Sequence, residues 1–248
     1  LAAMRKWGME TAGVQVDATR PTGRVRVALR GGQPSYDIVH PCAYDAIEAI
    51  EPVDSRLLYH GSLALRDEAS RVAFESLRNQ SKGKVFLDVN LRSPWWERDN
   101  LLSWLGRADW VKLNDEELAL LGPTGTSDEA AIDALFERDG LDGLFVTYGA
   151  EGAVLKTREH GRVRVKPDRA AVVVDTVGAG DAFAAICIIG ILKRWEAPKI
   201  LERAQRFASA IVDNIPVMFA VLVMGGLPRC WWVRGGCRRT RRRSSTSS

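Results

Sequence analysis

The stretch Asp175-Thr-Val-Gly178-Ala-Gly180-Asp181-Ala-Phe183 decides the fold. It follows the apolar run 171–174 and leads into the long apolar segment 179–193, so the chain passes there from a predicted strand to a predicted helix. Glycines at such a turn let backbone N–H groups converge, unshielded by side chains, on an anion at the helix N-terminus. The stretch therefore predicts an α/β fold with an anion site, for which phosphate is the natural guest.

Asp181 is an unusual residue for a plain phosphate site, because its carboxylate repels bound phosphate. The repulsion is explained if Asp181 accepts a proton from an attacking hydroxyl while the N–H groups stabilise a transferring phosphoryl group. In the alternative interpretation, Asp181 only stabilises the first turn of the helix through the helix dipole. A Rossmann dinucleotide site fits less well, since Phe183 stands where the third glycine is needed and the turn comes late in the chain.

Upstream of the turn, apolar runs alternate with helical patterns. The predicted strands are 56–61, 84–89, 109–113, 143–148 and 171–174, with a hairpin pair at 152–157 and 162–166. The predicted helices are 43–50, 66–80, 95–106, 115–121, 127–138 and 179–193. Continuous apolar strands between helices indicate a parallel sheet covered on both faces. Before this region, the segments 14–17, 24–30 and 36–39 predict a small antiparallel sheet with turns at 21–23 and 31–32.

Polar or glycine-rich groups follow four of these strands. They are Asp88-Val-Asn90-Leu-Arg92, Lys112-Leu-Asn114-Asp-Glu-Glu117, Thr147-Tyr-Gly149-Ala-Glu-Gly152 and the stretch from Asp175 to Asp181. In open α/β sheets the ligand binds beyond the carboxyl ends of the strands. We therefore expect these four groups to surround one site.

Composition and charge exclude several classes of protein. The chain has 248 residues, 46% of them apolar and 27% charged, which is typical of a globular protein and excludes a disordered or fibrous one. The net charge is +4, but the segment 229–248 holds seven arginines and no acid, so the first 228 residues carry 28 basic against 31 acidic side chains. The basic character belongs to the tail, and we expect no nucleic-acid or membrane partner for the rest.

The cysteines, histidines and N-terminus also limit the possibilities. Four cysteines without CxxC spacing and three scattered histidines favour neither a disulfide scaffold nor a zinc site. The N-terminus shows no signal peptide, and the longest apolar run, 215–227, is too short to cross a bilayer. We expect a cytoplasmic protein.

The glycine turn is similar to the C-terminal signature of the ribokinase-like, or PfkB, carbohydrate kinases. The other strand ends resemble the fructokinase-type branch of this family in the same order, from about residue 8 to about residue 213. The similar segments are Pro21-Thr-Gly-Arg-Val25, Gln33-Pro-Ser-Tyr-Asp37, Ala43-Tyr-Asp45, Gly61-Ser-Leu-Ala-Leu65, Asp88-Val-Asn-Leu-Arg92 with Trp95-Trp96, Lys112-Leu-Asn-Asp-Glu-Glu117-Leu118 and Val146-Thr-Tyr-Gly-Ala-Glu-Gly152. The resemblance implies a ribokinase-like three-layer α/β/α sandwich with a mostly parallel central sheet and a small antiparallel β lid.

The resemblance also implies roles for the residues around the glycine turn. Asp181 would be the base that activates a sugar hydroxyl, and Gly178, Ala179 and Gly180 would form the anion hole. Asn114 and Glu117 match the family's Asn-x-x-Glu pair, which places Mg²⁺ and the phosphates largely through water.

The same resemblance assigns the remaining polar strand ends to ATP and the sugar. Thr147, Gly149 and Gly152 match the nucleotide loop, where small residues let ATP approach the backbone closely. Lys112 is assigned to the nucleotide and Arg92 to the phosphate or the sugar. For both cations, a solvated or ion-paired side chain is the alternative interpretation.

The sequence departs from the family pattern at both ends. The sequence has no counterpart of the family's first strand, which carries a sugar-binding Asp, or of its Gly-Gly-x-x-x-Asn motif. The sequence after residue 213 resembles no segment of the family. We expect residues 1–13 to be the remnant of a truncated N-terminal part, 14–40 the β lid, 41–213 the kinase core and 214–248 an aberrant or disordered basic tail. A basic arm for nucleic acid or anionic lipid, and a solvated tail without function, are the alternatives for the last segment.

The function expected from the resemblance is the ATP- and Mg²⁺-dependent phosphorylation of a sugar hydroxyl. Fructose is the first candidate through the branch resemblance, ahead of 2-keto-3-deoxygluconate, ribose and nucleosides. The lid would close over the sugar and is a candidate homodimer contact. The alternatives are a non-catalytic sugar- or nucleotide-binding protein on the same fold and an inactive kinase fragment.

Overall fold

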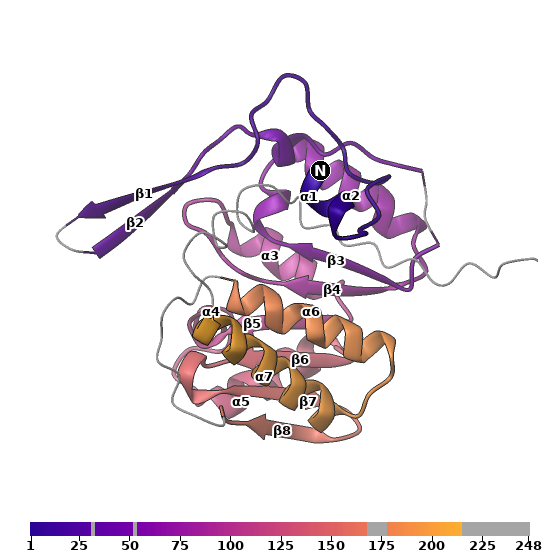
Figure 1. Ribbon diagram of the computed structural model, residues 1–248. Helices are drawn as coiled ribbons and strands as arrows, with labels where there is room; N and C mark the ends of the chain where they lie inside the picture. The colour runs from indigo at the N-terminus through magenta and orange to yellow at the C-terminus, as the bar shows by residue number, and fades with distance from the viewer. Residues whose placement is uncertain (31–32, 52–53, 168–177, 215–248) are drawn as a thin grey trace, which may run out of the picture.

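The computed structural model describes residues 1–30, 33–51, 54–167 and 178–214, and its centre is a six-stranded sheet (Figure 1). The strands lie side by side in the order in which they occur in the chain: β3 (Leu57–Gly61), β4 (Lys84–Asp88), β5 (Trp110–Asn114), β6 (Gly143–Thr147), β7 (Ala153–Thr157) and β8 (Gly161–Val165). The first four are parallel, and the last two are antiparallel additions. The predicted mostly parallel sheet is confirmed.

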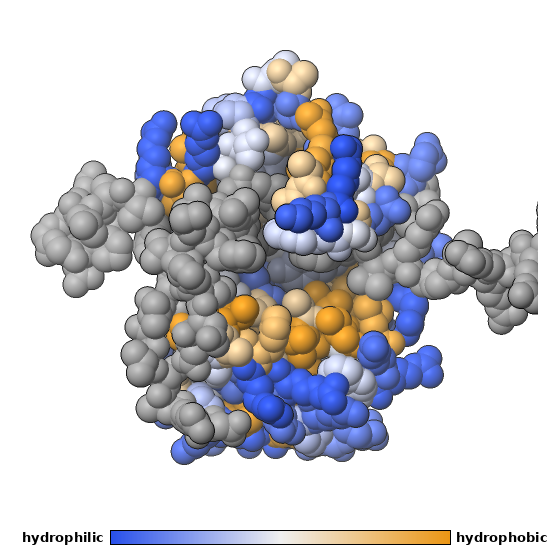
Figure 2. All heavy atoms as spheres, viewed as in Figure 1, coloured by the Kyte–Doolittle hydropathy of each residue, from blue (hydrophilic) through white to orange (hydrophobic). Residues whose placement is uncertain are grey.

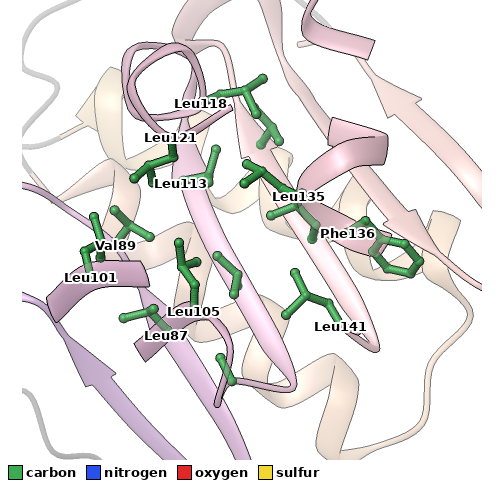
Figure 3. Close-up of a cluster of buried hydrophobic side chains, with 14 of the residues drawn as sticks. Leu87, Val89, Leu101, Leu105, Leu113, Leu118, Leu121, Leu135, Phe136 and Leu141 are labelled. Atoms are coloured by element: carbon green, nitrogen blue, oxygen red, sulfur yellow. The ribbon is translucent and has the colours of Figure 1, made fainter. Parts of the chain in front are cut away.

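Helices cover both faces of the sheet and form two separate cores. One face packs against α2 (Glu68–Gln80), α3 (Arg98–Leu105), α4 (Asp115–Leu121) and α5 (Asp128–Asp139). Figure 3 shows this core, in which leucines of the helices interdigitate with Leu87 and Leu113 of the strands. The other face packs against α6 (Ala179–Leu192) and α7 (Ala197–Asn214), which contact each other along their length. The three-layer α/β/α sandwich is thereby confirmed.

Local sequence explains where the helices beside the site begin and end. Asn114 accepts a hydrogen bond from the Glu117 N–H at 2.7 Å, and the Glu117 carboxylate accepts one from the Asn114 N–H at 2.9 Å. This reciprocal capping box starts α4 at the end of β5. Ser127 caps α5 in a similar way, and Gly140 ends that helix in the left-handed region with φ of +64°.

Helix α6 is apolar almost all round, unlike its neighbour α7. Such a helix is usually buried on every side, yet Ala185 and Ile189 are exposed. Figure 2 shows the apolar side chains gathered over this helix. Helix α7 was not predicted from the sequence, although Ile200, Leu201, Ala204 and Ala208 have helical spacing and all are buried.

Within the described residues, no helix is both long enough and apolar enough to span a membrane.

The small antiparallel sheet consists of two strands rather than three. Strands β1 (Val25–Arg30) and β2 (Gln33–Ile38) form a hairpin that extends away from the body (Figure 1), and the predicted turn at 31–32 lies outside the described residues. The strand predicted at 14–17 is wrong. Here the side-chain amide of Gln15, rather than its backbone, bonds both the N–H and the carbonyl of Glu48, at 2.8 and 2.7 Å.

The helix predicted at 43–50 is shorter than expected, and an unpredicted short helix stands before the hairpin. A single 3₁₀ turn, η1 (Ala43–Ala46), replaces the first, because the Ile47 N–H turns to the Ser70 hydroxyl of α2 at 3.1 Å instead of continuing the turn. Helix α1 (Ala2–Lys6) buries none of its residues. The predicted strand 171–174 and the tail 215–248 lie outside the described residues.

Candidate active site

The start of α6 carries all three predicted anion-hole residues and the predicted base. Gly178 is the N-terminal flanking residue and takes φ of +84°, a left-handed conformation that favours glycine. Its carbonyl accepts the first helical hydrogen bond, from the Ala182 N–H at 2.9 Å. Asp181 lies in this turn and is partly exposed. The turn thus offers unshielded N–H groups and a carboxylate at one helix terminus.

Lys112 lies under this turn. A Cβ placed on Gly180 would lie 3.6 Å from the Lys112 Nζ, so the ammonium lies on the side of Gly180 where a side chain would point. Only 7% of Lys112 is exposed, and its Nζ donates to Asp88 Oδ1 at 2.9 Å. Of the two interpretations for this lysine, the structure shows the ion-paired state. Its assignment to the nucleotide stays a prediction.

Asp88 was not among the predicted site residues, although it belongs to a quoted strand end. It is fully buried as the last residue of β4, and it stands opposite Lys112 in the parallel ladder. The Tyr59 hydroxyl of β3 donates to its second oxygen at 3.3 Å. A carboxylate that ends a buried apolar strand was the signal in the sequence, because such a group needs a partner.

Asn114 and Glu117 are brought together by the capping box of α4. The Glu117 carboxylate also accepts from the Leu91 N–H at 2.6 Å, so it holds the loop after β4 as well as the start of α4. Burial raises the pKa of Glu117 above its ordinary value, against the opposing effects of these two N–H groups and of Lys112.

The two residues of the capping box also suit a hard cation. Each Glu117 oxygen accepts one protein N–H, and the Asn114 oxygen accepts one more, which leaves a further lone pair on each. A cation nearby would favour the charged carboxylate. The oxygen donors therefore fit Mg²⁺ held through water molecules.

The predicted nucleotide loop begins beside Asn114. Thr147 is the ladder partner of Asn114 at the ends of β5 and β6. Gly149 has φ of +54° and open space where a Cβ would stand. Gly152 has φ of +96°, and a Cβ there would lie 2.0 Å from the Val165 carbonyl oxygen. Gly152 is therefore required by the packing of the hairpin itself, whether or not a nucleotide approaches.

Arg92 is the most exposed of the predicted cations. Its Nη1 donates to the Leu91 carbonyl at 2.9 Å, within its own loop. Asn90 in the same loop takes φ of +41°, an uncommon conformation for a residue other than glycine. The structure places Arg92 in the loop beyond the end of β4.

Comparisons with known proteins show which family the chain belongs to. Residues 1–219 match the model of the pfkB family carbohydrate kinases. The fructokinase of Klebsiella pneumoniae is 39% identical over 193 residues, which cover 72% of this chain and 61% of that protein. The Escherichia coli fructokinase is 30% identical over 235 residues, covering 86% of this chain and 75% of the relative. Fructokinase-2 of Zea mays is 33% identical over 168 residues, 63% of this chain, and the chain spans only about half (49%) of its length.

Solved structures resemble the fold over most of the chain. The fructokinase of Vibrio cholerae O395, in a form with fructose, ADP and calcium ion bound, has a TM-score of 0.75 at 22% identity and matches 89% of this chain and 76% of its own. The aminoimidazole riboside kinase of Salmonella enterica, complexed with aminoimidazole riboside and an ATP analog, has a TM-score of 0.71 at 26% identity, with the same coverage. On the family match, the relatives and the fold together, the chain belongs to the pfkB family of carbohydrate kinases, in its fructokinase-type branch.

Proposed function

We propose that the site transfers the γ-phosphoryl group of ATP to a hydroxyl group of a sugar. The hydroxyl oxygen forms a bond to the γ-phosphorus, the bond from that phosphorus to the β,γ-bridging oxygen breaks, and ADP leaves. Asp181 takes the proton of the hydroxyl, and the N–H groups of 178–180 stabilise the charge on the phosphoryl oxygens.

One observation carries this proposal furthest. The first turn of α6 presents a carboxylate, Asp181, next to a glycine, Gly180, that a buried ammonium, Lys112, faces. A plain phosphate site has no use for the carboxylate, whereas a phosphoryl acceptor with a proton to lose does. Mg²⁺, when bound near Asn114 and Glu117, would neutralise part of the charge of the triphosphate.

Fructose is the acceptor that we propose first. The support is that the relatives from Klebsiella pneumoniae, Escherichia coli and Zea mays are fructokinases, and that the similar Vibrio cholerae structure holds fructose. An ADP-release assay with a panel of fructose, ribose, 2-keto-3-deoxygluconate and nucleosides tests the choice. We expect the highest kcat/KM with fructose.

The variant Asp181→Asn tests the assigned base. It keeps the shape of the side chain but cannot accept the proton, so we expect kcat to fall by about 10²- to 10⁴-fold while ATP still binds. Asp99→Asn is the matched control, because Asp99 is an exposed carboxylate in the first turn of another helix, α3. Substantial turnover by Asp181→Asn would refute the assigned role. ATP binding by the unmodified chain without ADP release on any sugar would support a non-catalytic binding protein instead.

We further propose that the hairpin of β1 and β2 closes over the sugar and forms a contact between two subunits. Its two strands pair with each other, and among the described strands neither pairs with the central sheet. Both outer edges of the hairpin therefore present unpaired backbone groups that a second copy can bond. Sedimentation equilibrium is expected to give twice the chain mass of 27.4 kDa, and a monomer throughout the micromolar range contradicts the contact.

A further inference from the structure

Lys112 is a buried cation at a place where a cation is unfavourable. It is 7% exposed, and its Nζ faces the first turn of α6, 3.6 Å from where a Cβ on Gly180 would stand. A helix N-terminus carries a partial positive charge, which repels an ammonium, and burial removes the hydration that an ammonium needs. Other groups of the protein must therefore compensate for the repulsion from the helix N-terminus and for the lost hydration.

Asp88 and Tyr59 supply much of that compensation. Asp88 is 0% exposed and accepts from the Lys112 ammonium with one oxygen and from the Tyr59 hydroxyl with the other. The three side chains come from consecutive parallel strands, β3, β4 and β5. Because Asp88 and Lys112 are ladder partners, the register of the sheet holds the ion pair in position.

The remaining charges around Lys112 belong to the proposed site. The carboxylates of Asp88, Glu117 and Asp181 are the negative charges that act on Lys112, and Asp88 Oδ1 accepts from its Nζ at 2.9 Å. The Cys187 thiol of α6 also faces the pair, and burial raises its pKa well above the usual range, so it is neutral. Lys112 is thus an ion-paired cation between Asp88 and the turn that carries Asp181.

We propose that Lys112 supplies a fixed positive charge that acts through the α6 turn on the transferring phosphoryl group and on Asp181, and that Asp88 and Tyr59 hold it in place. This inference rests on the proposed kinase function. All three are positioning residues, because Lys112 is only 7% exposed and its ammonium is paired with Asp88. A preorganised charge of this kind costs no reorganisation when negative charge grows on the phosphoryl oxygens.

A set of neutral variants separates the charge from the packing. Lys112→Met keeps the length of the side chain and removes the charge, but it leaves Asp88 buried without its partner. The double variant Asp88→Asn with Lys112→Met removes both charges and keeps the shapes, so we expect it to fold with near-normal stability. In both, kcat is expected to fall by about 100-fold, with a smaller change in the KM for the sugar.

The titration of Asp181 gives a second readout that needs no catalytic activity. Its carboxyl ¹³C signal, assigned by its loss in Asp181→Asn, reports its pKa directly. Lys112→Met and the double variant remove a nearby cation and should raise the pKa of Asp181. Asp88→Asn leaves the cation unneutralised and should lower it. If Lys112 and Asp88 had only structural roles, their two single variants would not shift the pKa of Asp181 in opposite directions.

Lys84→Met is the matched control. Lys84 is also an ion-paired lysine of the sheet, 2.7 Å from Asp109, but it is exposed and lies at the opposite end of β4. We expect it to change neither kcat nor the pKa of Asp181. The proposal is overturned if the double variant folds and keeps kcat within threefold, or if Lys112→Met and Asp88→Asn move the pKa of Asp181 in the same direction. If the chain shows no kinase activity at all, the titration still decides the electrostatic claim.

Discussion

Arg66 forms a two-point ion pair with Asp45 in which both side chains are at most 2% exposed. The Nε and Nη2 of Arg66 donate to the two Asp45 oxygens at 2.6 and 2.7 Å. The guanidinium also lies between two aromatic rings, 5.0 Å from Tyr44 and 4.5 Å from Trp95, and it donates to the Val39 carbonyl. One side chain thus joins the base of the hairpin, the start of α2 and the loop that carries Arg92.

We predict that Asp45→Asn lowers the free energy of unfolding by about 3–5 kcal/mol, because it leaves the Arg66 charge buried and unpaired. Arg107→Gln is the matched control. Arg107 also makes a two-point contact, from Nη1 and Nη2 to the Glu75 oxygens at 2.7 and 2.6 Å, but both side chains are more than a third exposed. An exposed pair contributes at most about 1 kcal/mol. Urea unfolding measures both, and equal losses would contradict the prediction.

His60 makes the stability depend on pH. Burial lowers its pKa from the ordinary 6.5 to about 4. Between these two pH values His60 is protonated in the unfolded chain and neutral in the folded chain. Stability from this residue is complete above about pH 6.5 and is lost as the pH falls through about 4, by roughly 3 kcal/mol in total. Its ring packs 4.2 Å from the ring of Phe74.

His60→Phe keeps a ring in this position and removes the proton site. The variant should lose less stability than the unmodified chain between pH 7 and pH 4.5, and the difference isolates the histidine from the carboxylates that titrate nearby. Chemical denaturation at several pH values provides the measurement. Parallel curves for the two proteins would show that the neutral imidazole contributes nothing.

Glu117 should determine how much Mg²⁺ the enzyme needs. Glu117→Gln removes the negative charge and leaves one accepting oxygen, so either the Asn114 or the Leu91 N–H loses its acceptor, and we expect the free energy of unfolding to fall by about 1–3 kcal/mol. The Mg²⁺ concentration for half-maximal velocity is expected to rise about tenfold or more. Glu116→Gln, an exposed neighbour in the same helical turn, is the control and should leave this concentration unchanged.

The two glycines of the predicted nucleotide loop should respond differently to alanine. Gly149→Ala pays only for a left-handed backbone with open space around the new methyl group, about 1–2 kcal/mol. Gly152→Ala adds a collision with the Val165 carbonyl and should cost more. Thermal unfolding compares the two. If Gly149→Ala is the more damaging variant, the close approach of Gly152 to the Val165 carbonyl is contradicted.

Much of the fold could be predicted because it depends on local pattern. The bounds of α4 and the start of β6 follow from an apolar period with clear polar ends, and Asn114 with Glu117 is a capping signature readable from the sequence. The ion pair of Asp88 with Lys112 was not predicted, since it depends on the register between two strands, and a shift of one residue would turn every side chain to the other face.

Other features are not encoded in any local period. Asp45 and Arg66 lie in irregular segments on either side of β3, so no pattern connects them before the chain folds. The strand expected at 14–17 failed for a related reason, because a side-chain amide of Gln15 took over the hydrogen bonds that a backbone ladder would have made.

The order of the strands has a consequence for how the site is assembled. Since each strand of the sheet pairs with its neighbour in the sequence, the sheet can grow as the chain leaves the ribosome, with few long loops to close. The turn at Gly178–Asp181 is the exception, because it joins Lys112 and Asp88 only after β8 is complete and α6 has docked. Until then the ion pair remains in water. The proposed site is therefore completed only after the six strands of the sheet have formed.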